Sequence, residues 1–371
     1  MSVRESASVS DKVIVTGGCG YIGSHTIVEL IEAGYDVVSI DSNVRSDPSI
    51  LDGVERLTGK RVPNYAVDLQ DSCAADEVFA AHRDARAVIH FAAFKTVPES
   101  MAFPERYFRN NLGSLMTVLR SVERYRIPCL IFSSSCSVYG NPLNLPVTEE
   151  TPFGEAQSPY ARTKQIGETL IRECAAAGLT RFVSLRYFNP AGAHQSLEIG
   201  ESPFGKPENL VPAITQSALR LMPELVVHGT DYPTRDGSCV RDYIHVSDIA
   251  LAHVQALEYL NRSAVNHDVF NLGLGAGVTV LELLQAFERA TGVRPEFRLG
   301  PRRAGDPAAI YSGCEKAKRL IGWQPRFSLE EVVRTAWFWE LKRMRTAPGL
   351  GRANRQSDRH VARLTASLQI T

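Results

Sequence analysis

The feature that most constrains this fold is a short apolar run that passes through a glycine loop into a helix. Residues 13–16 read Val-Ile-Val-Thr, and Gly17, Gly20 and Gly23 follow at a spacing of three. The apolar pattern that comes next predicts a helix over 21–33. A strand that turns through glycines into a helix is the first half of a βαβ unit, whose strands are parallel. The chain is therefore predicted to be an α/β protein.

The same alternation of strand and helix continues along the first half of the chain. Further strands are expected at 37–41, 62–67, 87–91, 129–133 and 182–185, and further helices at 71–82, 104–125 and 159–177. Six strands joined by right-handed crossovers form a doubly wound, Rossmann-type parallel sheet, which binds ligands at the carboxyl ends of its strands.

After Pro190 the periodicity loosens, and Gly and Pro become dense, which predicts a smaller mixed α/β lobe. The expected division is a polar N-terminal extension (1–11), a nucleotide-binding Rossmann domain (12–189), the lobe, some of whose elements interleave with that domain (190–345), and a flexible or surface-helical C-terminal extension (346–371).

The spacing of the glycines predicts that the loop binds a dinucleotide cofactor. Glycines there permit a tight turn and a close backbone approach to a pyrophosphate at a helix N-terminus. Asp41 lies 18 residues beyond Gly23, at the end of the second predicted strand, where a carboxylate accepts from ribose hydroxyls and repels a 2′-phosphate. NAD is therefore expected rather than NADP, with Arg45 nearby as the one counter-indication. Asp68 either accepts from the adenine amine or caps the next helix.

Tyr160 and Lys164 stand one helical turn apart, downstream of the serine cluster 133–135. Ser158 and Pro159 are typical of an N-cap and a first helical position. A lysine at i+4 can favour the phenolate of its partner and so make it a base for a sugar or alcohol hydroxyl. The alternative is an ordinary exposed helix start.

Composition excludes several classes of protein. The chain has 371 residues, and Lys plus Arg equals Asp plus Glu at 41 each, so no general charge favours nucleic acid or an anionic membrane. Neither a membrane span nor a signal core is indicated. Seven scattered cysteines are typical of reduced thiols in a cytoplasmic protein, and no metal site is predicted.

Five motifs together resemble the extended short-chain dehydrogenase/reductase family and, within it, the UDP-galactose 4-epimerases. They are Thr-Gly-Gly-Cys-Gly-Tyr-Ile-Gly-Ser (16–24), Phe-Ser-Ser-Ser-Cys-Ser-Val-Tyr-Gly (132–140), Tyr160-x-x-x-Lys164, Arg-Tyr-Phe-Asn-Pro (186–190) and Val-Arg-Asp-Tyr-Ile-His-Val (240–246). The similarity extends from about residue 12 to 342.

The resemblance implies an NAD-dependent isomerase that interconverts UDP-galactose and UDP-glucose at sugar C4 through a transient 4-keto sugar. The cofactor stays bound and no net redox change occurs. Ser135, Tyr160 and Lys164 would be the catalytic trio, and helices 104–125 and 159–177 would form a homodimer.

The resemblance also implies the binding residues. For the cofactor they are Gly17, Gly20, Tyr21, Ile22, Gly23, Asp41, Asn43, Asp68, Leu69, Phe91, Ala92, Ala93, Lys95, Asn110, Ser133, Tyr160, Lys164 and Tyr187, with Asn111 packed near the site. The UDP-sugar pocket would be built mostly from the smaller lobe. Its residues would be Lys95, Ser135, Tyr160, Phe188, Asn189, Asn209, Leu210, Val227, His228, Arg241, Tyr243, Arg303, Asp306 and Ile310. Two converging arginines suit a diphosphate.

Related functions on this scaffold are another NAD-dependent nucleotide-sugar epimerase, a dehydratase or decarboxylase, or a non-catalytic NAD-binding protein. Elimination needs an added acid or base beside the catalytic serine, and here Cys136 and Ser137 follow it. Departures from the usual epimerase pattern are Ser42, His228 and Ala304. Ile310 takes a pocket-wall position where residues smaller than tyrosine accompany use of N-acetylhexosamines, so some UDP-N-acetylglucosamine activity is expected.

Overall fold

The central element is a seven-stranded parallel sheet. The computed structural model describes residues 11–346 except 179, 223, 304 and 305, so the predicted terminal extensions lie almost wholly outside the described residues. The strands follow the order β11 (His267–Leu272), β6 (Arg181–Tyr187), β5 (Cys129–Ser135), β4 (Ala87–His90), β1 (Lys12–Thr16), β2 (Asp36–Ile40) and β3 (Asn64–Tyr65). Every neighbouring pair is parallel. The predicted Rossmann-type α/β class is confirmed.

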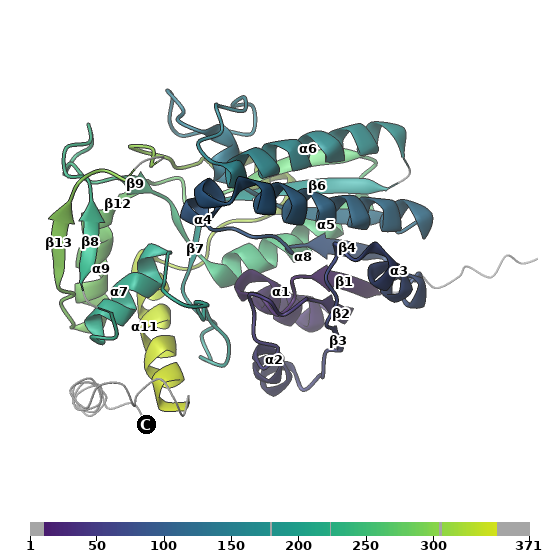
Figure 1. The fold of residues 1–371 in the computed structure, drawn as a ribbon, viewed down its shortest axis with the longest axis horizontal. Helices are drawn as coiled ribbons and strands as arrows, with labels where there is room; N and C mark the ends of the chain where they lie inside the picture. The colour runs from purple at the N-terminus through teal and green to yellow at the C-terminus, as the bar shows by residue number, and fades with distance from the viewer. Residues whose placement is uncertain (1–10, 179, 223, 304–305, 347–371) are drawn as a thin grey trace, which may run out of the picture.

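Both faces of the sheet are buried, which explains why its strands are apolar runs rather than alternating ones. Val13 and Val15 enter one core, and Ile14 enters the other. The first face is covered by α1 (Tyr21–Glu32), α2 (Ile50–Thr58), α8 (Val246–Arg262) and α10 (Glu315–Ile321), and the second by α3 (Ser72–Ala81), α5 (Pro104–Arg124) and α6 (Pro159–Ala177). Figure 1 shows α5 and α6 side by side over this second face.

A smaller lobe lies beyond the end of the sheet, on the left of Figure 1. Its core is formed by α7 (Leu210–Ala218), α9 (Val280–Thr291) and α11 (Leu329–Thr346) with β8 (Leu225–His228), which pairs with β13 (Phe297–Gly300). Phe287 and the fully buried Trp337 meet edge to face, with ring centres 5.5 Å apart. The junction with the sheet carries α4 (Val97–Ala102), η1 (Cys136–Tyr139), β7 (Asn189–Ala191), β9 (Val240–Arg241), β10 (Tyr243–His245) and β12 (Val278–Thr279).

The expectation of six strands is wrong by one. The seventh strand, β11, comes from within 190–345, pairs with β6 and is preceded by α8, which packs on α1. A strand of six residues that begins His267-Asp268 carries too weak an apolar pattern to be assigned without its partner. None of the helices in the described ranges is long and apolar enough to cross a membrane.

Candidate active site

The glycine loop lies between the carboxyl ends of three strands. Gly17 donates its N–H to Ile40 O at 2.8 Å and has a φ of +74°, and a Cβ there would come within 2.8 Å of Ala92 N. A Cβ on Gly23 would lie 2.2 Å from Gly17 O. α1 begins after Gly20, which has no side chain to cover the first N–H groups of the helix. The loop therefore fits an anion such as a pyrophosphate at this helix end.

Asp41 is held at the end of β2 by three donors. Its carboxylate accepts from Cys19 N at 3.0 Å, Asn43 N at 3.0 Å and Ser46 Oγ at 2.8 Å. Asn43 takes a φ of +57° to make this turn. The carboxylate thus stands beside the glycine loop, where the predicted NAD ribose needs it.

Asp68 does not cap the next helix, so that interpretation is wrong. The N-cap of α3 is Asp71, whose carboxylate accepts from Cys73 N and Ala74 N at 3.1 Å. Asp68 is exposed and accepts from Gln70 N at 2.9 Å. Its proposed contact with adenine remains a prediction.

The other predicted cofactor residues lie along the same edge of the sheet. Phe91, Ala92, Ala93 and Lys95 follow β4, and Gln70 Nε2 joins the Asp68 turn to Asn110 Oδ1 at 3.3 Å. Ile22 packs against the core beneath the glycine loop. The hydroxyl of Tyr21 donates to Gly192 O at 2.6 Å, and Leu69 is only 4% exposed, so both side chains are engaged within the protein.

The predicted catalytic residues meet where β5 ends and α6 begins. Ser158 caps α6 by accepting from Ala161 N at 3.1 Å, as predicted, which sets Tyr160 in the first turn. Tyr160 is hydrogen-bonded to the Ser135 side chain. Lys164 Nζ donates to Ser133 O at 2.6 Å. The Ser133 and Tyr187 hydroxyls are also hydrogen-bonded, so β5, β6 and α6 converge on one point.

The expected lowering of the pKa of Tyr160 by Lys164 is wrong for the protein by itself. Burial raises the pKa of Tyr160 to about 12, and the hydrogen bond from Ser135 offsets this only in part. Burial also lowers the pKa of Lys164 to about 8, although the Glu168 carboxylate opposes this. Lys164 Nζ lies 5.8 Å from the centre of the Tyr160 ring because it is bonded to Ser133 O. Tyr160 is therefore protonated at neutral pH.

Asn111 ties the segment after β4 to this site. Its Oδ1 accepts from Phe94 N at 2.8 Å, and its Nδ2 donates to Thr163 Oγ1 at 3.1 Å. Thr163 Oγ1 in turn donates to Tyr160 O at 2.7 Å. Asn111 therefore packs near Tyr160, through Thr163, as predicted.

The two predicted diphosphate arginines converge on one carboxylate. Arg303 forms a bidentate pair with Asp306, with N–O distances of 2.9 and 3.0 Å, and Arg241 Nη2 lies 3.6 Å from Asp306 Oδ1. Arg241 also acts electrostatically on Cys136, which directly follows Ser135. Arg241 therefore lies close enough to the predicted catalytic segment to act on it, although the two are far apart in sequence. Ala304, between the arginine and the carboxylate, lies outside the described residues.

The side chain of Asn189 has a hydrogen-bond acceptor that a bound ligand could use. Its Oδ1 is buried and has no hydrogen-bond partner among the described residues. Leaving a buried acceptor unpaired costs about 1–3 kcal/mol, which a bound hydroxyl would remove. Asn209 and Leu210 begin α7, and Ile310, 4% exposed, donates its N–H to Val240 O at 3.1 Å beside Arg241.

Some predicted substrate contacts are less accessible. Val227 and Tyr243 are 1% and 3% exposed within the lobe core, and Phe188 is 5% exposed. His228, by contrast, is exposed, and its Nδ1 lies 3.2 Å from Pro301 O. The contacts predicted for these four residues with the substrate remain predictions.

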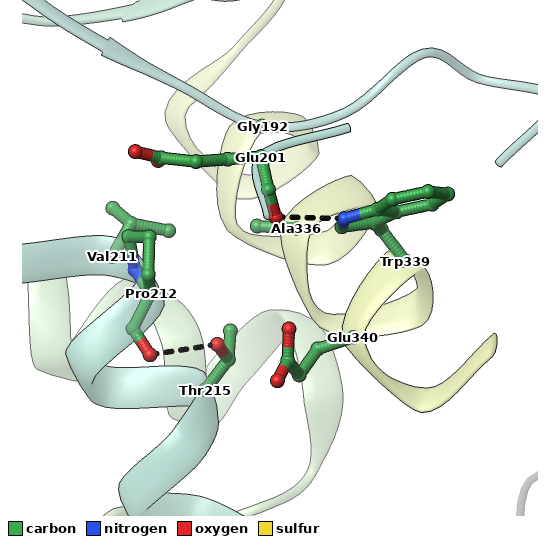
Figure 2. A pocket seen from close by; sticks show the side chains of 8 residues that line it. All are labelled: Gly192, Glu201, Val211, Pro212, Thr215, Ala336, Trp339 and Glu340. Atoms are coloured by element: carbon green, nitrogen blue, oxygen red, sulfur yellow. Dashed lines mark hydrogen bonds between the residues drawn. The ribbon is translucent and has the colours of Figure 1, made fainter. Parts of the chain in front are cut away.

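Glu201 was not predicted from the sequence, yet it links two residues that were. Its Oε1 accepts from Asn209 Nδ2 at 2.6 Å and lies 3.5 Å from Lys95 Nζ. Figure 2 shows its main-chain oxygen accepting from Trp339 Nε1, at 2.8 Å, beside a small pocket lined also by Thr215 and Glu340. That pocket lies inside the lobe and contains none of the predicted site residues. No spacing pattern signals a carboxylate that acts 106 residues from Lys95.

No three His, Cys, Asp or Glu side chains within the described part of the chain are grouped so as to hold a metal ion. The groups that meet at the end of β5 are hydroxyls, a phenol and an ammonium, a set suited to proton transfer at a hydroxyl.

Comparison with known proteins identifies the family. The profile of the NAD dependent epimerase/dehydratase family matches residues 13–273. This chain belongs to that family. Among its relatives in the NAD dependent epimerase/dehydratase family, the UDP-glucose 4-epimerase of Bacillus subtilis is 45% identical over 329 residues, covering 88% of this chain and 96% of the relative. The UDP-glucose 4-epimerase of Drosophila melanogaster is 42% identical over 336 residues, covering 88% and 96%.

Solved structures of UDP-glucose 4-epimerases superpose closely on this chain. The UDP-glucose 4-epimerase from Stenotrophomonas maltophila, crystallised with NAD and formylated UDP-arabinopyranose, superposes with a TM-score of 0.88 at 44% identity, covering 91% of this chain and 99% of that one. The enzyme from Bifidobacterium longum, in complex with NAD+ and UDP, gives 0.86 at 42% identity, with coverages of 89% and 98%. The resemblance seen in the sequence motifs is confirmed.

Proposed function

We propose that this chain is a UDP-glucose 4-epimerase, an NAD-dependent isomerase that interconverts UDP-galactose and UDP-glucose. The observation that carries the proposal is the meeting of Tyr160, Ser135 and Lys164 beside an arginine pair, Arg241 and Arg303, that suits a diphosphate. The glycine loop and Asp41 fit NAD by the packing described above.

The glycine loop and Asp41 would hold NAD, which would supply reversible hydride exchange at sugar C4 and a positive nicotinamide charge that favours the phenolate of Tyr160. Tyr160, directly or through Ser135, takes the proton of the 4-hydroxyl and later gives it back. Lys164 adds positive charge beside them. Arg241 and Arg303 hold the diphosphate, so the hexose can present either face to the same acid/base pair.

The positions after Ser135 favour epimerisation over elimination. Cys136 and Ser137 form the start of η1, and Ser137 N donates to Ser135 Oγ at 3.2 Å. A thiol and a hydroxyl supply neither the acid nor the base that a dehydratase needs at this point. A non-catalytic NAD-binding protein would not need the hydrogen-bonded trio.

A coupled assay of UDP-galactose conversion without added NAD tests the reaction, the substrate and the retained cofactor together. The purified protein should form UDP-glucose, and heat-denatured protein should release NAD. Absence of conversion, with or without added NAD, would show that the reaction is assigned wrongly.

We further propose a secondary activity on UDP-N-acetylglucosamine and UDP-N-acetylgalactosamine, because Ile310 is a shorter pocket-wall residue than tyrosine. Ile310→Tyr should lower the rate for the N-acetyl pair relative to the glucose/galactose pair by about tenfold or more, since overpacking blocks the larger substituent. Ile310→Val should keep the wild-type ratio. An unchanged ratio in Ile310→Tyr would remove Ile310 as the gate.

We also place the protein in the cytoplasm as a homodimer. All seven cysteines are unpaired thiols, which suits a reducing compartment. The predicted dimer helices α5 and α6 adjoin one another, and Met116 on α5 is 52% exposed.

A further inference from the structure

Behind the catalytic residues lies a buried charged network that the proposed mechanism does not use. Glu168 and Arg186 have side chains only 3% and 6% exposed, and they form a bidentate pair with distances of 2.9 Å for Nε–Oε1 and 2.6 Å for Nη2–Oε2. Arg186 Nη1 donates to Tyr139 OH at 2.8 Å, and Tyr139 OH donates to Asn271 Oδ1 at 2.6 Å. A buried ion pair of this kind is weak evidence for stability, because desolvation offsets its attraction.

The position of Glu168 gives the network a route to the site. It is one helical turn beyond Lys164 on α6, so the two side chains share a face of the helix. Its Oε1 also accepts from Ser134 Oγ. The neighbours of Ser134 are Ser133, whose carbonyl receives Lys164, and Ser135, which is bonded to Tyr160. The Glu168 carboxylate therefore links α6, which carries Tyr160 and Lys164, to the end of β5, which carries Ser135.

Charges around Lys164 single out Glu168 further. On β4, His90 is uncharged at neutral pH, because burial lowers its pKa to about 3 and the nearby Lys164 adds to this. On β6, burial raises the pKa of Tyr187 well above its usual range, so it is neutral too. Arg186 on β6 is a cation, and its charge is met by Glu168. Of the described residues, Glu168 is thus the anion that acts on the Lys164 ammonium.

We propose that Glu168 is a positioning residue for the epimerase reaction: it holds the end of β5 against α6 and sets a carboxylate on the same helix face as Lys164. This inference rests on the proposed function. In this view Arg186, itself bonded to Tyr139, holds the Glu168 carboxylate in place. The role of Glu168 also explains why a buried ion pair that is costly to desolvate lies next to Lys164.

The sign of the pH effect follows from the charges. Burial lowers the pKa of Lys164 to about 8 while Glu168 works to raise it, so removing the carboxylate charge lowers it further. Lys164 then loses its proton at a lower pH, so the fall of kcat on the alkaline side of the pH profile, its alkaline limb, shifts to lower pH. Glu168→Gln keeps the acceptor for Ser134, so the shift reports the lost charge rather than the lost contact.

The experiment compares kcat and KM across pH for the wild type, Glu168→Gln and Glu168→Gln/Arg186→Met. The double variant removes the Arg186 guanidinium that Glu168→Gln alone would leave buried without a carboxylate, so it should fold even if the single variant does not. We expect the pKa of the alkaline limb to fall by about one unit in both variants, so that kcat near pH 8 is about fivefold lower than in the wild type and KM stays within about twofold. Glu168→Asp should retain the wild-type limb. Glu173→Gln, on an exposed side chain of the same helix, should match the wild type throughout.

A second readout does not depend on activity. In protein labelled with 13C at lysine Cε, the Lys164 signal, assigned through Lys164→Arg, should titrate about one pH unit lower in the folded variants than in the wild type. If the wild type catalyses the reaction but neither the kcat limb nor this titration moves, the role of Glu168 is overturned. If the wild type is inactive, the proposed function fails instead, and the lysine titration still tests the link between Glu168 and Lys164.

Discussion

Replacing Tyr160 by phenylalanine should slow the interconversion of UDP-galactose and UDP-glucose by a factor of about 10²–10⁴, the range that a positioned general acid/base supplies. The change removes the phenolic oxygen that is bonded to Ser135 and keeps the ring. The folded protein should retain its thermal stability and its NAD. Steady-state kcat, the melting temperature and the NAD released on denaturation measure these three outcomes.

Tyr125→Phe is the matched control. Tyr125 follows α5 at the opposite edge of the sheet, just before β5 begins, and its hydroxyl donates to Asp76 at 3.0 Å. Its loss should leave kcat within about twofold, because surface substitutions usually have small effects. Undiminished turnover in Tyr160→Phe would falsify the assignment of Tyr160 as the proton carrier.

Arg241→Met should raise the KM for UDP-sugars by about 100-fold, with a smaller change in kcat. Arg241 is only 13% exposed and shares Asp306 with Arg303, so its guanidinium is poised for a charge-assisted hydrogen bond to the diphosphate. Such a bond contributes about 1.5–3 kcal/mol, and binding shared by ground and transition states appears in KM. Calorimetry with UDP alone should show the same loss of affinity.

Arg302→Met separates this effect from a general loss of positive charge. Arg302 lies beside Arg303 in sequence but is bonded to Asp231 at 2.8 Å and stacks over Tyr232 at 4.3 Å. It should leave KM within about threefold. Equal KM increases in Arg302→Met and Arg241→Met would show that the site senses overall charge and not a specific arginine.

Much of the fold was predictable because its signals are local. The run 13–16, the glycines after it and the Ser158-Pro159 cap each have a conformational reason within a few residues, and they lie where expected. The seventh strand was missed because 267–272 is recognisable only once β6 lies beside it. The resemblance to epimerases, and not the residues' spacing, implied that Arg241, Arg303 and Asp306 serve one site, and the contact of Arg241 with Asp306 was not predicted.

The sequence by itself determined the Rossmann-type class, the preference for NAD and the residues that should transfer a proton, since each depends on residue type at short spacing. Only the tertiary structure decided the electrostatics of those residues. Burial raises the pKa of Tyr160 and lowers that of Lys164, while Glu168 contacts Ser134 across 34 residues of sequence. Desolvation depends on everything packed around a group, and no pattern of nearest neighbours along the chain contains that information.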